Sequence, residues 1–293
     1  MASPCGATNR CEKQPSKGKI NLTVGDGAGQ PLAEMSEASS QREGERARIE
    51  AAERAFFAEY YSGGVFHPLG MELRLARELR WIRRITGGGR LGRVLSVGCG
   101  DGRFERMVAP YADHVLGIDL SPEAVAAARG EAERQGHAHL EFRCQSLLEL
   151  EWDRMFDVVF CLALLHHIPA GELPGFLRQV YEHLQPGGWL FTHDPNQRGI
   201  LRHVGRWLLG ARYHRFHSPD ERELDPDELA ALLRATGFSR VQIGYLDHTL
   251  IPSMYLLARG PGWPLRLCLA IDWLWCRSPL RRWSSAFTIA ARR

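Results

Sequence analysis

A glycine-rich turn and a downstream acid are the residues of this chain whose types and spacing most directly suggest chemistry. The apolar run Arg93–Val97 ends at glycines 98, 100 and 102, and Asp119 follows Gly98 by 21 residues, at the end of a second apolar run. Glycine has no Cβ, so the backbone can turn tightly there and approach a ligand closely. A turn and an acid at the ends of adjacent parallel strands suit the binding of a nucleoside, with the acid on the ribose.

The spacing of the glycines is G-x-G-x-G. The dinucleotide fingerprint requires its third glycine one place later, at position 103, where this chain has Arg103. The pattern therefore disfavours a nicotinamide-dependent oxidoreductase. Taken alone, it also fits an ordinary turn between a strand and a helix.

A second group of reactive residues follows later in the chain. His166 and His167 come after the apolar run Phe156–Cys161, and His193 and Asp194 come after the run that begins at Trp189. Histidine is the usual general base near neutral pH. Because His166 and His167 are adjacent, their side chains are expected to point in different directions. We take His166 and His193 as the candidate bases, with a purely structural role as the alternative for each.

The elements that position these residues alternate regularly between strand and helix from residue 93 to residue 193, which is typical of a doubly wound α/β sheet. Ligands of such sheets bind at the carboxyl ends of the strands. The predicted strands are Arg93–Val97, Val115–Asp119, His139–Cys144, Phe156–Cys161 and Trp189–His193, and the predicted helices are Phe104–Ala109, Pro122–Gln135 and Leu173–Leu184.

The pattern changes on both sides of this core. The N-terminal side has two amphipathic patterns, one from Gln41 to Tyr60 and one over Leu69–Ile85. The C-terminal side has an apolar helical stripe over Ile200–Leu209, a capped helix that starts after Asp225, and two more strands, Arg240–Leu246 and Ala286–Ala291. We predict a mostly parallel seven-stranded sheet with helices on both faces and a helical lid.

Composition divides the chain further. Residues 1–40 are rich in Gly, Ser and Pro and are expected to be a disordered tail. We expect N-terminal helices over 41–90, the ligand-binding core over 91–195, and the lid with the last strands over 196–293.

The bulk numbers exclude several classes of protein. Hydrophobic residues make up 44% of the 293 residues, charged residues 24%, and the net charge is only +3, so a nucleic-acid partner is not expected. The seven cysteines form no C-x-x-C pair and no zinc spacing, so no metal site is predicted. We expect free thiols, a cytoplasmic location and no secretory signal.

Four stretches together resemble the class I S-adenosylmethionine-dependent methyltransferases. The order and spacing of the stretches agree with this family as well as the letters do, over roughly residues 90–195. They are VLSVGCGDG at Val94–Gly102, VLGIDLS at Val115–Ser121, FDVVFCLALLHHI at Phe156–Ile168, and LQPGG at Leu184–Gly188.

The resemblance implies that S-adenosylmethionine is the cofactor and gives individual residues a role in binding it. Asp119 would accept hydrogen bonds from both ribose hydroxyls, and Leu120 would pack on the adenine. For Asp101 two roles remain open, contact with the cofactor and stabilisation of the turn. The implied cofactor-binding residues are Gly98, Cys99, Gly100, Asp101, Gly102, Asp119, Leu120, Ser146, Leu147, Cys161 and Leu162.

One position departs from the family pattern. Many relatives carry an acid after the third strand that contacts the adenine amino group, and the matching residue here is Ser146, preceded by Gln145. A hydroxyl can accept a hydrogen bond from this amine, but without charge assistance.

The lid is expected to select the methyl acceptor. It would comprise 41–64, 197–217 and 250–283, and Arg259–Arg293 holds seven Arg and a single acid, Asp272, among interleaved Trp residues. This composition favours a small hydrophobic or lipid-linked acceptor and peripheral membrane contact through 200–215 and 259–283. A lid that packs on the core with a solvated basic rim is the alternative. A protein or nucleic-acid methyltransferase and a non-catalytic binding module remain the alternative functions.

Overall fold

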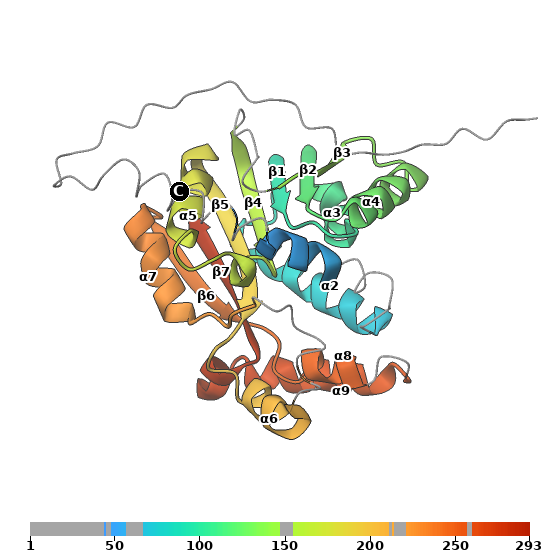
Figure 1. Cartoon of the computed structure of the whole chain (residues 1–293), viewed down its shortest axis with the longest axis vertical. Helices are drawn as coiled ribbons and strands as arrows, with labels where there is room; N and C mark the ends of the chain where they lie inside the picture. Colours follow the sequence, from blue (N-terminus) through green and yellow to red (C-terminus); the bar gives the residue numbers. More distant parts are fainter. Residues whose placement is uncertain are drawn as a thin grey trace, which may run out of the picture. The chain divides into compact units, whose positions relative to one another are not determined.

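The computed structural model describes residues 44, 48–56, 67–146, 155–210, 213, 221–256 and 260–293. The chain divides into two compact units, 1–48 and 49–293, and the second holds every labelled helix and strand of Figure 1. The predicted tail over 1–40 lies outside the described residues, as does Leu147. The divisions after residues 40, 90 and 195 stay predictions.

The second unit is built on one seven-stranded sheet with the order β3-β2-β1-β4-β5-β7-β6 (Figure 1). β7 is antiparallel to both of its neighbours, and the other strand pairs are parallel. The predicted α/β fold is therefore confirmed. The strands are β1 (Arg93–Val97), β2 (His114–Asp119), β3 (Leu140–Cys144), β4 (Phe156–Leu162), β5 (Leu184–Pro195), β6 (Arg240–Tyr245) and β7 (Ala286–Arg292).

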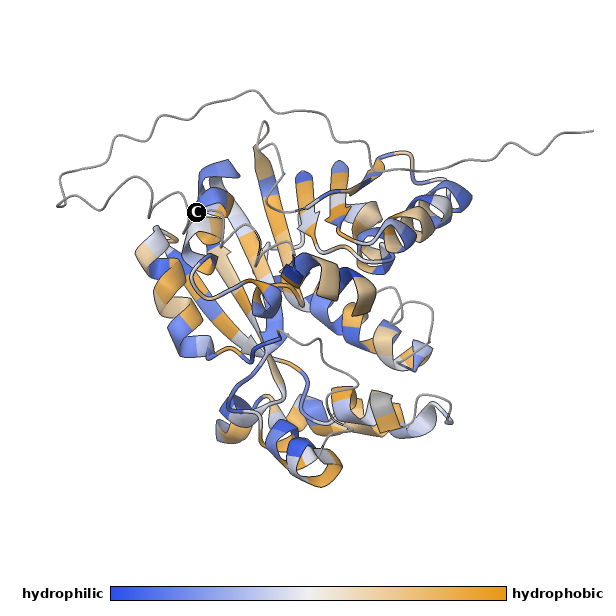
Figure 2. Cartoon of the chain, in the orientation of Figure 1, coloured by the Kyte–Doolittle hydropathy of each residue, from blue (hydrophilic) through white to orange (hydrophobic). Residues whose placement is uncertain are grey.

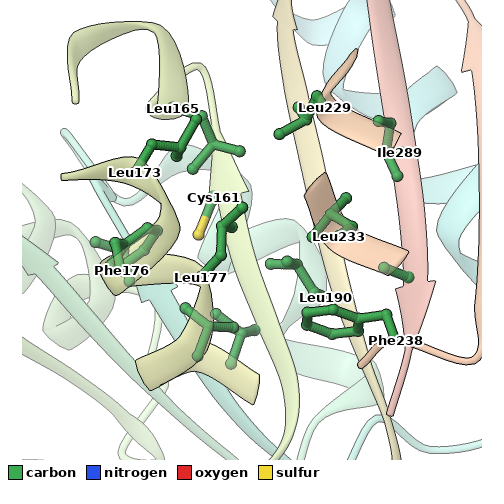
Figure 3. Close-up of a cluster of buried hydrophobic side chains, with 14 of the residues drawn as sticks. Cys161, Leu165, Leu173, Phe176, Leu177, Leu190, Leu229, Leu233, Phe238 and Ile289 are labelled. Carbon is green, nitrogen blue, oxygen red and sulfur yellow. The ribbon is translucent and has the colours of Figure 1, made fainter. Parts of the chain in front are cut away.

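Helices cover both faces of the sheet because each helix carries one apolar stripe that must be buried. One face packs against α2 (Pro68–Ile85), α3 (Arg103–Val108) and α4 (Pro122–Arg134). The other face packs against α5 (Leu173–His183) and α7 (Pro226–Thr236), and Figure 3 shows the side chains of this second core. Ser121 and Asp225 cap α4 and α7 as predicted, each accepting backbone N–H groups of the first turn.

β5 is longer than the predicted Trp189–His193 and differs at its start. It begins at Leu184, which pairs with Phe156, and the pairing then shifts so that Val158 pairs with Trp189. The intervening Gln185–Gly188, predicted as a turn, forms an irregularity within the strand, and Gly187 takes a positive φ of 82° there.

Two of the three segments predicted for the lid, 197–217 and 250–283, hold α6 (Ile200–Leu209), α8 (Leu250–Leu256), α9 (Trp263–Trp275) and the 3-10 segment η5 (Pro279–Trp283), and α6, α8 and α9 group together in Figure 1. α8, α9 and η5 are inserted between β6 and β7. Tyr245 at the end of β6 pairs with Phe287 at the start of β7, so the two ends of this insertion lie side by side. None of the described helices is long and apolar enough to cross a bilayer.

The stability of the sheet depends on a close approach at Gly117 in β2. A Cβ at this position would lie 2.7 Å from Phe142 Cδ1 and 3.0 Å from Cys99 Sγ. We expect Gly117→Ala to lower the free energy of unfolding by about 1–3 kcal/mol through overpacking. Urea denaturation measures this change.

Gly130, in the exposed part of α4, is the matched control because a Cβ there meets nothing within 4 Å. Gly130→Ala is expected to raise the stability by about 0.5–1 kcal/mol. Equal effects of the two substitutions would contradict the packing argument.

Candidate active site

The glycine turn after β1 has the backbone conformation that glycine permits. Gly98, Gly100 and Gly102 have φ values of 73°, 55° and 67°. A Cβ at Gly102 would lie within 2.9 Å of Phe142 and Ala128, so the turn could not hold a larger residue without moving these neighbours. Asp101 Oδ1 accepts the backbone N–H of Arg103 over 3.1 Å, which is the turn-stabilising role left open for this residue.

Asp119 lies at the carboxyl end of β2, directly beside this turn. Its Oδ2 accepts the N–H of Gly100 over 2.8 Å, and its Oδ1 accepts the N–H of Ser121 over 2.9 Å. Burial raises the pKa of the carboxyl above its usual value, against the effect of these hydrogen bonds. Because a carboxylate oxygen has two lone pairs, each oxygen keeps one position for a ligand hydroxyl.

The end of β3 brings Ser146 to the same edge of the sheet. Ser146 is 8% exposed, and its Oγ donates to Glu50 Oε1 over 2.6 Å. Glu50 belongs to the N-terminal helix, by which we mean the helical residues 49–56 of the second unit. The predicted amphipathic pattern is thus helical up to Phe56, and its continuation to Tyr60 lies outside the described residues.

The chain after β4 takes a strained conformation. Ala163 has a φ of 58° and is the only non-glycine residue with positive φ among the described residues. Such conformations cost energy in residues with a Cβ and gather at functional sites. The Ala163 N–H donates to the His193 carbonyl over 2.6 Å, which ties this loop to β5.

His166 follows in the same loop and is bonded to Asp194 of β5. Asp194 Oδ1 accepts the backbone N–H of His166 over 3.2 Å and lies 2.9 Å from His166 Nδ1. Both side chains are buried. Burial raises the pKa of Asp194 to about 7 and lowers the pKa of His166 well below its usual value. The two groups therefore form a buried, partly neutral pair that can exchange one proton.

His193 does not join this pair, although both histidines are candidate bases. Successive residues of a strand point to opposite faces, so His193 points to the α2 face and Asp194 to the α5 face. His193 is 2% exposed, its Nδ1 lies 2.8 Å from Glu78 Oε2 of α2, and its Nε2 lies 3.5 Å from Asp247 Oδ2. The two candidate bases therefore lie on opposite faces of the sheet, and their catalytic roles stay predictions.

His167 directly follows His166 and contacts the N-terminal helix. Its Nδ1 is 3.1 Å from Glu53 Oε2 of the N-terminal helix. Within the described ranges, His166, His167 and Glu221 offer ligand atoms within 4.8 Å of one another, an arrangement that could hold a cation. Arg202 Nη2 is 3.5 Å from Glu221, and the positive charge of Arg202 also lowers the pKa of His166. We assign no metal to this group.

Comparison with known proteins identifies the family of this chain. Residues 94–188 match the family model described as a methyltransferase domain. The chain is 29% identical over 189 residues to a ubiquinone biosynthesis O-methyltransferase of Bordetella avium, with 61% of this chain and 76% of the relative covered. It is 30% identical over 186 residues to the corresponding protein of Bordetella bronchiseptica, with the same coverage. The chain belongs to the class I S-adenosylmethionine-dependent methyltransferases.

The fold agrees with this assignment. A SAM-dependent methyltransferase from Archaeoglobus fulgidus superposes with a TM-score of 0.53 at 18% identity, covering 76% of this chain and 94% of that one. The resemblance in the sequence is therefore confirmed for the family and the fold, and S-adenosylmethionine is the cofactor of this methyltransferase.

The residues at the sheet edge fit this cofactor. Gly98, at the start of the turn, is exposed, and Asp119 keeps one acceptor position on each carboxylate oxygen, as two ribose hydroxyls require. Leu120 and Leu162 are half-buried at the ends of β2 and β4. Assignment of these residues to the cofactor remains a prediction.

The two cysteines among the predicted cofactor residues have buried side chains. Cys161 is fully buried and lies beside Leu177 in the core under α5 (Figure 3), so it can offer the cofactor only its backbone. Cys99 is 9% exposed and packs with Phe142 and Val125. Burial raises the pKa of both thiols well above the usual value, and among the described cysteines all thiols are free.

Sequence reasoning missed the acids that α2 and the N-terminal helix supply. Glu50 and Glu53 contact Ser146 and His167, and Glu78 contacts His193. A signal for Glu78 was available, because this acid lies on the apolar stripe of α2 beside Leu75 and Leu79 and is 2% exposed. An acid on a stripe that becomes buried needs a polar partner.

Proposed function

We propose that this methyltransferase methylates a hydroxyl group of a small acceptor with an apolar tail, taken from a membrane surface. The main support for this proposal is the distribution of exposed hydrophobic side chains. Of the described residues, every large hydrophobic side chain that is exposed lies between positions 200 and 283, on α6, α8, α9 and η5. The largest exposed fractions belong to Trp207 at 82%, Leu256 at 76%, Trp263 at 68%, Leu208 at 66% and Leu274 at 64%.

The charges of the same segments favour an anionic lipid surface. Exposed arginines accompany these side chains at positions 206, 266, 277, 281 and 282. The only acid between residues 260 and 283, Asp272, is fully buried, where it accepts the N–H groups of His248, Thr249 and Leu250. Figure 2 shows hydrophobic residues along α6 and α9 beside hydrophilic ones. Trp, Leu and Arg on short helices suit the interfacial region of a bilayer.

The comparisons support an oxygen acceptor of this kind, because the relatives named above are ubiquinone biosynthesis O-methyltransferases. A lid that inserts into the headgroup region would let an apolar acceptor pass from the bilayer to the sheet edge without crossing water. A cytoplasmic protein with peripheral membrane contact fits this proposal.

We assign the role of general base to His166, with Asp194 as its orienting partner. The sulfonium of bound S-adenosylmethionine supplies an electrophilic methyl group. The chain's own task is to align the acceptor oxygen and remove its proton, and alignment alone can contribute about 7–11 kcal/mol. Asp194 holds Nδ1 of His166, so that Nε2 is the ring atom that would accept the proton. His193 is the weaker candidate because Glu78 and Asp247 flank both of its ring nitrogens.

Vesicle flotation tests the membrane proposal. The wild-type protein is expected to float with vesicles that contain anionic phospholipid, and much less with zwitterionic vesicles. The variant Trp207→Glu/Leu274→Glu adds two charges to highly exposed positions and should abolish flotation. Ala126→Glu/Ala127→Glu, on the exposed side of α4, is the matched control and should float like the wild type.

Activity on extracts tests the acceptor class. With radiolabelled cofactor, we expect label in the organic phase of a membrane lipid extract, and much less of it with the Trp207→Glu/Leu274→Glu variant. Label in protein or nucleic acid would contradict the proposal, as would a wild-type protein that stays with the unbound fraction at every lipid composition.

A further inference from the structure

The order of the strands fixes the direction in which a nucleoside can lie along the sheet edge. The glycine turn follows β1, Asp119 ends β2, and β3 is the next strand outward and the last on this side. With the ribose on Asp119 and the amino acid part at the turn, the base must extend toward the end of β3. The inference therefore rests on the roles proposed for the turn and Asp119.

Among the described residues at the end of β3, up to residue 146, none is an acid. Cys144 ends the strand, and Gln145 and Ser146 follow it. Ser146 instead contacts a carboxylate from a segment 96 residues earlier, where Glu50 Oε1 accepts the Ser146 hydroxyl over 2.6 Å. Glu50 is half-buried, so its carboxylate is partly shielded from water.

We propose that Glu50 recognises the adenine amino group of the cofactor, in place of an acid on the strand. An amino group attached to the adenine ring offers two N–H donors, and a carboxylate is an acceptor-only group. Ser146 donates to Oε1, which orients the carboxylate, and Oε2 is the oxygen assigned to the amino group. A hydrogen bond to a charged acceptor is stronger than one to the hydroxyl of Ser146 alone.

A second contact keeps the N-terminal helix in place for this role. Glu53 follows Glu50 by three residues, a spacing that places both side chains on one face of a helix. Glu53 is buried, and its Oε2 lies 3.1 Å from Nδ1 of His167. The helix is thus fixed at the ends of both β3 and β4, and Glu50 does not depend on Ser146 alone for its position.

Calorimetric titration with two ligands tests the proposal. S-adenosylhomocysteine carries the amino group, whereas S-inosylhomocysteine carries a carbonyl oxygen at the same place, which the carboxylate would repel. We expect the wild-type protein to bind the adenine compound about 10- to 100-fold more tightly, the range for one hydrogen bond to a charged group. Glu50→Gln should reduce this ratio to about 3-fold or less, because an amide can donate to the carbonyl as well as accept from the amine.

Three variants separate recognition from a structural role. Glu50→Gln/Ser146→Asp should restore the ratio, since it returns an acid to the same place. Ser146→Ala should keep the ratio above about 5-fold, because Glu53 still holds the helix. Glu133→Gln, an exposed acid at the end of α4, should leave both affinities unchanged.

Two results would overturn the inference. One is a wild-type protein that binds both compounds equally. The other is a Glu50→Gln variant that weakens both compounds by the same factor, which indicates a structural role. Failure to bind S-adenosylhomocysteine at all would instead argue against the cofactor site, so the two failures can be told apart.

Discussion

Asp194→Asn is expected to lower kcat about 100- to 10,000-fold, the range for loss of general acid–base catalysis. Asp194 Oδ1 accepts the backbone N–H of His166 and lies within hydrogen-bond distance of its ring Nδ1. An asparagine in its place can present an N–H to Nδ1, which favours the tautomer with the proton on Nε2, the atom assigned as the base. Initial-rate assays with radiolabelled cofactor measure the change. The affinity for S-adenosylhomocysteine should change little, because Asp194 lies on β5 rather than beside the glycine turn.

The pH dependence of kcat/KM provides a second test of the His166–Asp194 pair. Burial raises the pKa of Asp194 to about 7, and an Asp194 that has lost its negative charge by protonation supports the N–H at Nδ1 of His166 less well, so that Nε2 becomes a weaker base. The wild-type kcat/KM should therefore fall as the pH drops through about 7 and stay level above it, and Asp194→Asn should remove this inflection. His193→Gln is the control on the opposite face of the sheet and should keep the inflection. An Asp194→Asn enzyme with the wild-type rate and pH profile would contradict the assignment of His166.

The raised pKa of Asp194 also determines how its contribution to the free energy of unfolding changes with pH. The folded-state pKa of Asp194 is raised above that of an unfolded aspartate, so its contribution to stability is complete below about pH 4 and is lost as the pH rises through about 7. Glu105, whose pKa burial raises to about 7, acts in the same direction. The free energy of unfolding of the wild-type protein, measured relative to that of Asp194→Asn, should therefore decrease between about pH 4 and pH 7.

The second large effect is expected at Asp119. Asp119→Ala should weaken binding of S-adenosylhomocysteine about 100- to 10,000-fold, because it removes two hydrogen bonds to a charged acceptor at about 1.5–3 kcal/mol each. The carboxylate also accepts the N–H of Gly100, so its loss releases the glycine turn. Isothermal titration calorimetry measures the affinity directly.

Asp113→Ala is the matched control for this substitution. Asp113 immediately precedes β2 at its opposite end, is exposed, and pairs with Arg90. Its removal should leave the affinity unchanged. If Asp119→Ala bound S-adenosylhomocysteine as well as this control does, the ribose contact assigned to Asp119 would be wrong.

Much of the fold could be predicted from local patterns. The buried strands are continuous apolar runs, and helix starts are marked by residues such as Ser121 and Asp225, whose capping bonds the structure contains. The predicted limits of β1 agree with the structure at both ends. The start of β5 was missed because Gln185–Gly188 has the composition of a turn, whereas its irregular pairing depends on the neighbouring strand β4.

The candidate site could be predicted only in part, for a physical reason. The glycine turn and Asp119 are marked by motifs, because the ligand requires those residue types at the ends of strands. The partners Glu50, Glu53 and Glu78 come from helices far away in the sequence, and an acid on an amphipathic helix has no local signature of what it contacts. The separation of His193 from Asp194 was predictable, since neighbouring residues of a strand must face opposite ways.

The pairing of Tyr245 with Phe287 has a consequence for how this enzyme could change over evolution. Two adjacent antiparallel strands can be joined by as few as two residues, yet here β6 and β7 are joined by a helical segment that carries the exposed Trp and Arg side chains. Because the entropy cost of closing a loop grows only slowly with its length, such a segment can be lengthened, shortened or exchanged at small cost. If this segment selects the acceptor, as proposed, acceptor preference can diversify while the sheet and the glycine turn remain intact.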